Sequence, residues 1–251
     1  MPELIVLGSA ASVPDAEHDT VSLLLRGPDW AILIDPGGSP LHKLAQFGVE
    51  PDDIRAVMLT HHHADHIYGL PILVQGLWLD GRESPLPIYG PQQALDRARR
   101  LLELFDLAER EGMFSLEWVP VPLREGRKVL AQGDIQITAA PTIHAGNDTV
   151  ALRFENTASG RSVVYSADTE PCPALVRLAA GADLLLHEAT GDHPGHTSPA
   201  QAAGVAREAG VAQLALIHYP VRGVNTESWR RRAAGFHGPV TLACDGDIYP
   251  L

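Results

Sequence analysis

Cysteine is scarce in this chain of 251 residues, which contains only Cys172 and Cys244, in separate segments. Two isolated cysteines exclude a disulfide framework, and they also exclude a structural zinc site built on paired cysteines. The scarcity agrees with a reducing compartment, where thiols stay unpaired.

Long hydrophobic runs are also missing. The first apolar run, at 4–7, is too short for the core of a signal peptide and has no basic flank, and no run approaches the roughly 20 residues of a membrane span. Hydrophobic residues make up 45% of the chain and charged residues 20%, as in a globular protein. The sequence therefore predicts a cytoplasmic protein without a membrane-spanning segment.

Basic residues are outnumbered, with 19 Lys and Arg against 31 Asp and Glu and a formal net charge of −12. Such a charge opposes tight binding of a polyanion unless cations cluster locally. Arginines do cluster at 97–100 and at 230–232. No aromatic residues interleave with them as stacking platforms, so both clusters are interpreted as solvated helix faces.

Histidine, by contrast, is concentrated. Residues 60–66 read Thr-His-His-His-Ala-Asp-His and directly follow the apolar stretch 56–59. Because side chains of an extended segment alternate, His61 and His63 can face one point while His62 faces away. A helix beginning near Asp65 would let Asp65 and His66 reach a second point. The segment predicts the start of two metal positions, each of which needs further ligands.

Two alternatives for this histidine segment are weaker. A low-complexity or tag-like tract lies at a terminus, whereas this one lies between an apolar strand and an apolar helix. A structural zinc site usually has four protein ligands, often with paired cysteines, and the two cysteines of this chain lie in separate segments.

Short apolar runs bounded by glycine, proline and aspartate predict a series of strands and helices without an interrupting linker, so 1–251 is expected to be one domain. Strands are expected at 3–8, 21–25, 30–34, 55–60, 86–90, 115–120, 134–140, 149–155, 161–166, 183–187 and 213–218. Helices are expected after Ser39, after Asp65, and at 91–109, 173–180 and 199–210.

Three further candidate ligands lie where an expected strand ends: His144, Asp168 and His218. Each alone would be interpreted as a capping aspartate or a surface histidine. Loops at one edge of packed sheets are where a rigid scaffold presents chemistry, so their shared position supports a single site.

The segment His61-x-His63-x-Asp65-His66 resembles the signature of the metallo-β-lactamase superfamily of binuclear hydrolases. The longer segment 60–71, with Gly-Leu-Pro after the histidines, is similar to ribonuclease Z more narrowly. Further resemblances follow in the same order over nearly the whole chain: LGSAASVP at 7–14, IDPG at 34–37, IYGP at 88–91, YSADT at 165–169, HEAT at 187–190, GHTS at 195–198 and IH at 217–218.

The resemblance implies an α/β fold, an αββα sandwich of two mixed β-sheets flanked by helices, with the site along one edge of the sheets. The ligands it implies are His61, His63 and His144 for one metal, Asp65, His66 and His218 for the other, and Asp168 between the two. A carboxylate has two oxygens and can span two cations, and neutral imidazoles suit zinc, iron or nickel. Two divalent ions are expected, with zinc first and manganese, iron or nickel as alternatives.

Three residues complete the expected site. The loop residue His196 is expected to protonate the leaving group or stabilise developing charge, and Glu188 to hold its tautomer. Asp35 is expected to accept a hydrogen bond from a ligand imidazole. The alternatives are a surface loop histidine for His196 and a turn residue for Asp35. Asp65 is expected both to bind metal and to orient the nucleophile.

The leading hypothesis is a phosphodiesterase for small or single-stranded phosphodiesters, in which two cations lower the pKa of a shared water from roughly 16 towards neutrality and the resulting hydroxide attacks phosphorus. Ribonuclease Z carries a tRNA-clamping arm between the positions matching His144 and Asp168, but here these residues are only 24 positions apart. The missing arm and the acidic charge disfavour tRNA as substrate.

Three alternatives stay open. They are a carboxylic ester, lactone or thioester hydrolase, a tRNA 3′-processing endoribonuclease, and a metal-binding module without catalysis. An open bridging position argues against the last. A homodimer is implied by the resemblance alone.

Overall fold

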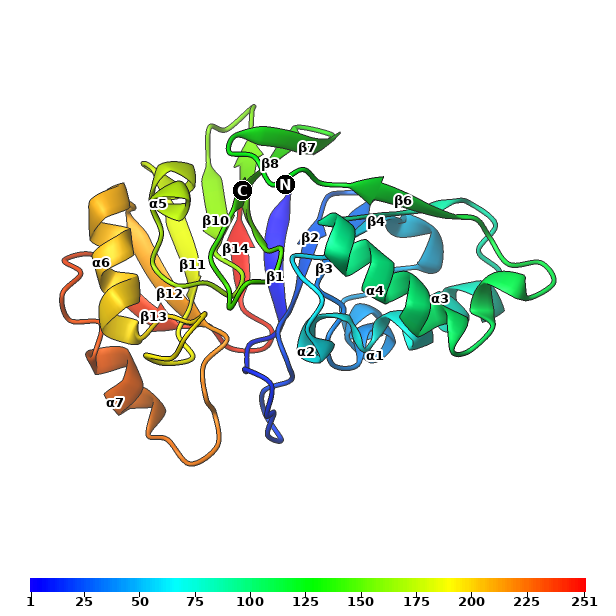
Figure 1. Ribbon diagram of the computed structural model, residues 1–251. Coiled ribbons are helices and arrows are strands. Elements are labelled where there is room, and N and C mark those ends of the chain that lie inside the picture. Colours follow the sequence, from blue (N-terminus) through cyan, green and yellow to red (C-terminus); the bar gives the residue numbers. More distant parts are fainter.

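Two seven-stranded β-sheets pack face to face in the computed structural model, which describes residues 1–251, and helices cover their outer faces (Figure 1). The first sheet has the order β14-β1-β2-β3-β4-β5-β6 and the second β13-β12-β11-β10-β9-β8-β7. The strands of the first sheet are β1 (Glu3–Gly8), β2 (Ser22–Arg26), β3 (Ala31–Ile34), β4 (Ile54–Met58), β5 (Leu86–Gly90), β6 (Leu116–Pro120) and β14 (Ile248–Pro250). Those of the second are β7 (Arg127–Gln132), β8 (Ile135–Pro141), β9 (Val150–Asn156), β10 (Ser162–Tyr165), β11 (Leu184–Glu188), β12 (Gln213–Ile217) and β13 (Val240–Leu242). The predicted αββα sandwich is confirmed.

Helices divide between the two outer faces (Figure 1). Those beside the first sheet are α1 (Pro40–Gln46), α2 (Ala64–Ile67), α3 (Leu70–Leu79) and α4 (Gln92–Glu103), and those beside the second are α5 (Pro173–Ala179), α6 (Pro199–Ala209) and α7 (Thr226–Arg231). Buried leucines and alanines of α3 and α4 pack in one outer cluster, and those of α5 and α6 pack in the other. None of the helices has the length and apolar character needed to cross a lipid bilayer.

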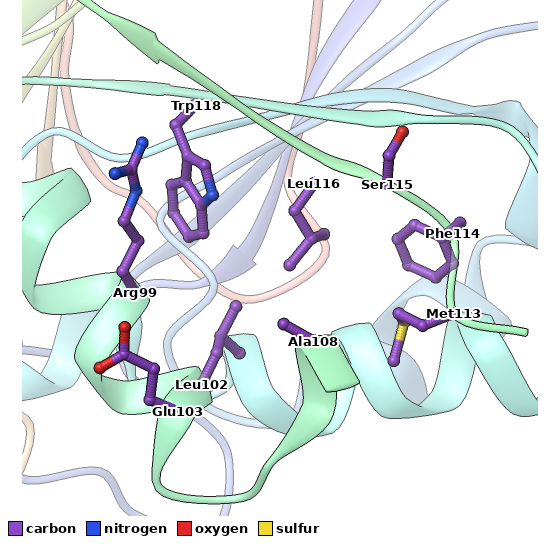
Figure 2. A pocket seen from close by; sticks show the side chains of 9 residues that line it. All are labelled: Arg99, Leu102, Glu103, Ala108, Met113, Phe114, Ser115, Leu116 and Trp118. Atoms are coloured by element: carbon purple, nitrogen blue, oxygen red, sulfur yellow. The ribbon is translucent and has the colours of Figure 1, made fainter. Parts of the chain in front are cut away.

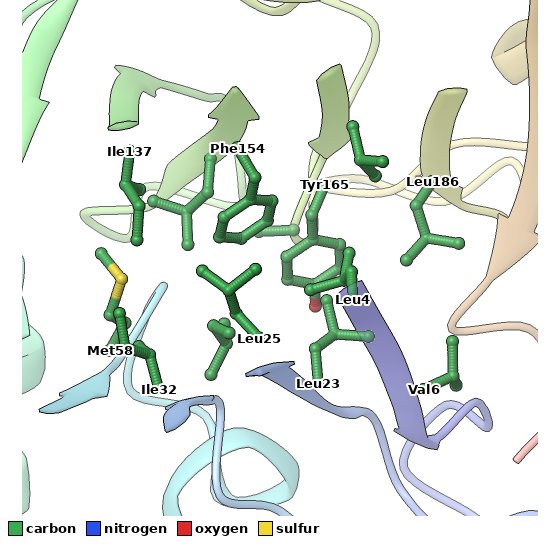
Figure 3. Close-up of a cluster of buried hydrophobic side chains, with 14 of the residues drawn as sticks. Leu4, Val6, Leu23, Leu25, Ile32, Met58, Ile137, Phe154, Tyr165 and Leu186 are labelled. Atoms are coloured by element: carbon green, nitrogen blue, oxygen red, sulfur yellow. The ribbon is translucent and has the colours of Figure 1, made fainter. Parts of the chain in front are cut away.

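The main hydrophobic core lies between the sheets (Figure 3). Alternation along β2 shows how the sequence builds it, because Leu23 and Leu25 enter the core between the sheets while Leu24 packs towards the helices. Full burial of one such side chain stabilises the fold by roughly 1.5–3 kcal/mol. Since both faces of β2 are covered, its three central positions are all leucine.

Strand direction brings the candidate residues to one edge. Strands β10, β11 and β12 pair in parallel, and β8 runs the same way because both β8 and β10 are antiparallel to β9. The carboxyl ends of β8, β10 and β12 therefore meet, and His144, Asp168 and His218 follow them. In the first sheet β3 and β4 are parallel, and Asp35 and His61 follow their carboxyl ends.

The segment between His144 and Asp168 contains no inserted arm. It consists of the β-hairpin β9–β10, in which Ser162 pairs with Glu155 and Tyr165 with Leu152. This agrees with the two strands that the sequence predicts there, at 149–155 and 161–166.

Several element boundaries differ from the prediction. The helix expected at 91–109 ends at Glu103, because Asp106 takes a left-handed conformation with φ of 50°. The helix after Asp65 divides into α2 and α3, and α3 carries Pro71 in its first turn, a position that tolerates proline. Strands β7, β13 and β14 and helix α7 had no sequence prediction, since β13 and β14 have three residues each and β7 is largely exposed.

A cavity of about 490 Å³ lies between α4 and β6 (Figure 2). Its wall is apolar apart from Arg99, Glu103 and Ser115, and the Arg99 guanidinium sits 5.0 Å from the centre of the Trp118 ring. None of the predicted site residues lines it, so this cavity is separate from the edge at which the candidate ligands meet.

Candidate metal centre

The structure brings all seven predicted metal ligands together. They form two groups of metal-capable side chains, with the ligand atoms of each group within 4.8 Å of one another. The groups are His61, His63, His144 and Asp168, and Asp65, His66 and His218. A third, overlapping group joins Asp168 and His218 to His196.

Asp168 belongs to the first group but also faces histidines of the second, and it is fully buried. Its Oδ2 atom is 3.9 Å from His61 Nε2 and 3.8 Å from His144 Nε2. Its Oδ1 atom is 3.5 Å from His66 Nε2 and 3.4 Å from His218 Nδ1. Each carboxylate oxygen therefore faces a different pair of imidazoles, which is the arrangement that a bridge between two cations requires.

The polar atoms at the centre of the site have no protein partner. His61 Nε2, His66 Nε2 and Asp168 Oδ1 are buried and make no hydrogen bond. Leaving such atoms unpaired is costly, and the exceptions in folded proteins call for an ion, a water or a functional role. Nitrogen and carboxylate donors in this arrangement fit two divalent cations.

Charge within the cluster is distributed unevenly. Burial and the neighbouring His66 hold the pKa of His61 well below its usual value, so this imidazole is neutral and has a lone pair for a cation. Burial also lowers the pKa of His66, but the carboxylates of Asp168 and Asp35 outweigh it and raise that pKa well above the usual value. The histidines around Asp168 lower its pKa against the opposing effect of burial.

Outer contacts fix the orientation of the imidazole rings of His66 and His144. His66 Nδ1 donates to Asp35 Oδ2 at 2.9 Å, and His144 Nδ1 donates to the Gly195 carbonyl at 2.7 Å. In both rings the outer contact occupies Nδ1, so that Nε2 faces the centre of the cluster, where His66 Nε2 has no protein partner. Asn147 Nδ2 lies 3.2 Å from His63 Nε2, while His63 Nδ1 faces His144 Nε2 at 3.0 Å.

Asp35 lies where the sequence predicts it. It is fully buried, and its carboxylate accepts from the Thr60 amide at 2.8 Å, the Thr60 hydroxyl at 2.7 Å and His66. The Tyr165 hydroxyl also points to Asp35, at 3.4 Å. The carboxylate therefore ties the start of the histidine segment to the ring of His66.

Strained backbone gathers at this edge of the sandwich. Five non-glycine residues have positive φ, and four of them belong to the site or adjoin it: Asp35, Ala145, Ala167 and His218. Such conformations cost about 1–3 kcal/mol each and persist where the surroundings enforce them. The sharp turns at the strand ends direct these side chains, or their neighbours His144 and Asp168, into one place.

Glu188 holds the loop that carries His196. It is fully buried, and its carboxylate accepts from the amides of Thr169 (3.1 Å), Thr190 (2.8 Å) and Thr197 (3.1 Å) and from His196 Nδ1 (3.0 Å). His196 Nδ1 is also 4.0 Å from Asp168 Oδ2. Burial lowers the pKa of His196, but the hydrogen bond and charge of Glu188 outweigh it, so the net shift is upward.

Comparison with known proteins identifies the family. A domain model described as Beta-lactamase superfamily domain matches residues 31–219, about three quarters of the chain. The chain belongs to the beta-lactamase superfamily. As a member it is a metal-dependent hydrolase, and its histidine and aspartate cluster is suited to two metal ions.

Within the superfamily the chain is similar to ribonuclease Z. It is 32% identical to ribonuclease Z of Mycobacterium bovis over 98% of this chain and 96% of that protein. It is 30% identical to ribonuclease Z of Methanothermobacter thermautotrophicus over 90% of this chain and 89% of that protein. The crystal structure of the metallo-beta-lactamase fold protein YhfI from Bacillus subtilis superposes with a TM-score of 0.81 at 28% identity, covering 99% of this chain and 98% of that one.

Sequence reasoning missed some residues of this superfamily site. The Ser12 hydroxyl donates to Asp65 Oδ2 at 2.5 Å, and Thr190 Oγ1 lies 2.8 Å from His218 Nδ1. Both lie in segments that carry the resemblance, 7–14 and 187–190, but neither residue type by itself signals a role. Asn147 had no sequence signal, because its position depends on the turn between His144 and Asn147.

Proposed function

We propose that the protein is a binuclear metal-dependent phosphodiesterase that acts on small or single-stranded phosphodiesters. The observation that carries this proposal is the division of the Asp168 carboxylate between two pairs of histidines. Similarity to ribonucleases Z supports phosphodiester chemistry for a site of this composition.

The proposed ligands come from both sheets. His61, His63 and His144 would hold one cation, Asp65, His66 and His218 the other, and Asp168 both, with zinc as the first choice of metal. Two cations held there supply Lewis acidity and lower the pKa of nearby water. Because His61 follows a strand of the first sheet and His144 a strand of the second, neither sheet holds a complete set. This supports 1–251 as a single domain.

His196 is proposed to deliver a proton to the leaving oxygen. Its Nδ1–H donates to Glu188, so Nε2 is the nitrogen left to meet a substrate. The Glu188 carboxylate also accepts hydrogen bonds from three backbone amides, which keep it in place while it orients the imidazole. An alkoxide is a poor leaving group, and a positioned acid contributes about 10²–10⁴-fold to such a step.

Substrate size is proposed from the surroundings of the site. The hairpin β9–β10 occupies the segment in which a long arm would have to be inserted. The chain carries a formal net charge of −12, which opposes long polyanions. Both observations favour short diesters over a folded tRNA.

Hydrolysis of bis-p-nitrophenyl phosphate, measured beside p-nitrophenyl acetate and a lactone, tests the proposal when metal content is determined on the same sample. We expect the wild-type protein to hydrolyse the diester and to contain two ions per chain. The Asp168→Asn variant should lose both the diester turnover and the bound ions. Brisk ester or lactone turnover with no diester turnover would replace the proposal with a carboxylic ester or lactone hydrolase.

A further inference from the structure

We propose that Asp245 is a remote positioning residue that clamps the loop 9–19 and, through Ser12 of that loop, orients Asp65. The inference rests on the proposed metal-binding role of Asp65. Asp245 lies outside residues 31–219, the part of the chain that the superfamily model matches.

The contact between Ser12 and Asp65 is the inner end of this connection. Ser12 Oγ donates to Asp65 Oδ2 at 2.5 Å. The same oxygen lies 3.3 Å from His218 Nε2 and 3.9 Å from His66 Nε2. A carboxylate oxygen has two lone pairs, so Ser12 can fix the rotation of Asp65 and leave a lone pair directed at the site.

The tip of the loop has no packing of its own to hold Ser12 there. Residues 12–17 are exposed, and Val13 is 57% exposed. Beyond Ser12, the side-chain contacts at the tip are local, with Asp15 Oδ1 accepting from the amides of Glu17 and His18 at 2.8 and 2.9 Å. The position of Ser12 therefore depends on how the two ends of the loop are held.

Backbone bonds from Ala10 to Asp19 and from Ala11 to Tyr219 hold the ends in part, and one carboxylate contacts both ends as well. Asp245 Oδ1 accepts from the Ser9 amide at 2.9 Å and from the Ser9 hydroxyl at 2.8 Å. Asp245 Oδ2 accepts from the Asp19 amide at 2.9 Å and pairs with Lys43 Nζ at 2.6 Å. The side chains of Asp245 and Lys43 are only 11% and 19% exposed, so water screens these charge-assisted bonds weakly.

The clamp joins distant parts of the sequence. Asp245 lies in the turn between β13 and β14, 236 residues after Ser9. That turn has a separate brace, because Asp247 Oδ2 accepts from the Cys244 amide at 2.9 Å and does not touch the loop. Asp247 therefore offers a control, because its substitution disturbs the turn but leaves the contacts of Asp245 with the loop 9–19 in place.

A double-mutant cycle separates positioning from general stability. The variants are Ser12→Ala, Asp245→Asn, both together, and Asp247→Asn as the control. Mn²⁺ binding to metal-stripped protein is measured by titration calorimetry, and amide hydrogen exchange of residues 9–19 is measured without metal. Diester turnover is measured in parallel.

We expect Ser12→Ala and Asp245→Asn each to weaken one of the two Mn²⁺ binding events by about tenfold, as loss of an outer contact to a ligand does. The double variant is expected to show no further loss. Amides of Ser9 and Asp19 are expected to exchange faster in Asp245→Asn, and Asp247→Asn to leave both readouts at wild-type values. If Asp245→Asn does not fold, Ser9→Ala removes one bond of the clamp and should shift metal affinity in the same direction by less.

Full additivity of Ser12→Ala and Asp245→Asn in metal affinity would overturn the connection through Ser12. Unchanged metal affinity in both single variants would overturn the role of the loop. Absence of diester turnover in a wild-type protein whose metal affinity still depends on Asp245 would reject the proposed function and leave the clamp standing.

Discussion

Asp35 and His66 form a fully buried carboxylate–imidazole pair in which His66 Nδ1 donates to Asp35 Oδ2 at 2.9 Å. The pair directs the other nitrogen of the ring, which has no protein partner, towards Asp168. The orientation of the His66 ring is therefore set by the folded chain itself, before any cation binds.

The Asp35→Asn substitution should lower metal affinity by about 10–100-fold, because a neutral amide no longer holds the His66 imidazole as the carboxylate does. Asparagine tolerates the left-handed backbone of this position, where φ is 49°. Titration calorimetry on the metal-stripped variant measures the effect. The exposed Asp29→Asn is the control, and equal affinities for the two variants would contradict the role of Asp35.

Replacing His196 with alanine should lower diester turnover by about two to four orders of magnitude while metal content stays full. The loss should be larger for an alkoxide leaving group than for p-nitrophenolate, which departs without protonation. Steady-state kinetics with both kinds of diester make this comparison. His193→Ala, on an exposed position of the same loop, should keep wild-type rates, and a loss independent of the leaving group would remove His196 as the acid.

Relieving one strained turn should stabilise the fold. Ala145 is exposed and has φ of 46°, a conformation that costs an alanine about 1–2 kcal/mol and glycine very little. We expect Ala145→Gly to raise the free energy of unfolding by about 0.5–1 kcal/mol in urea denaturation. The same substitution at Ala45, exposed in α1, should lower it by about 0.5–1 kcal/mol. Equal signs for the two changes would show that Ala145 is unstrained.

Stability should fall in mild acid because of His187, which lies away from the metal ligands on β11. Burial depresses the pKa of His187 from 6.5 to about 4 in the folded protein. Between these values the unfolded chain binds a proton that the folded chain does not, so stability is full above pH 6.5 and declines as pH falls towards 4.

The full effect of His187 is about 3 kcal/mol, from a pKa difference of roughly 2.5 units. Urea unfolding of metal-stripped protein at pH 7.5 and pH 4.5 measures it. His187→Leu should reduce the stability difference between the two pH values by most of this 3 kcal/mol relative to wild type, and an unchanged pH dependence would show that His187 does not contribute.

The clustering of the seven candidate ligands was largely predictable because the positions of strands are readable from local patterns. Once short apolar runs mark β8, β10 and β12, the residues after them fall at one sheet edge if the strands run the same way. The segment 61–66 then supplied the remaining candidate ligands within six residues. Whether these side chains bind metal in the proposed division stays a prediction.

Contacts that depend on where the chain turns, or that join residues distant in the sequence, were not predictable. The end of α4 depends on the left-handed Asp106, a conformation with no reliable sequence signal for aspartate. The contact of Ser9 with Asp245 joins opposite ends of the chain, and three-residue strands such as β14 are too short for periodicity to show. Local patterns therefore reveal the candidate ligands, with Asp35 and Glu188, better than contacts such as those of Ser12 and Asp245.

The sharing of each ligand group between the two sheets has a mechanical consequence. A cation held in the proposed way, by His61 from one sheet and His144 from the other, would be a cross-link across the sandwich at the edge where the strands end. Removal of bound ions should therefore weaken the packing of the two sheets against each other as a whole. A substitution that disturbs the packing between the sheets should in turn lower the metal affinity, even where it lies far from the site.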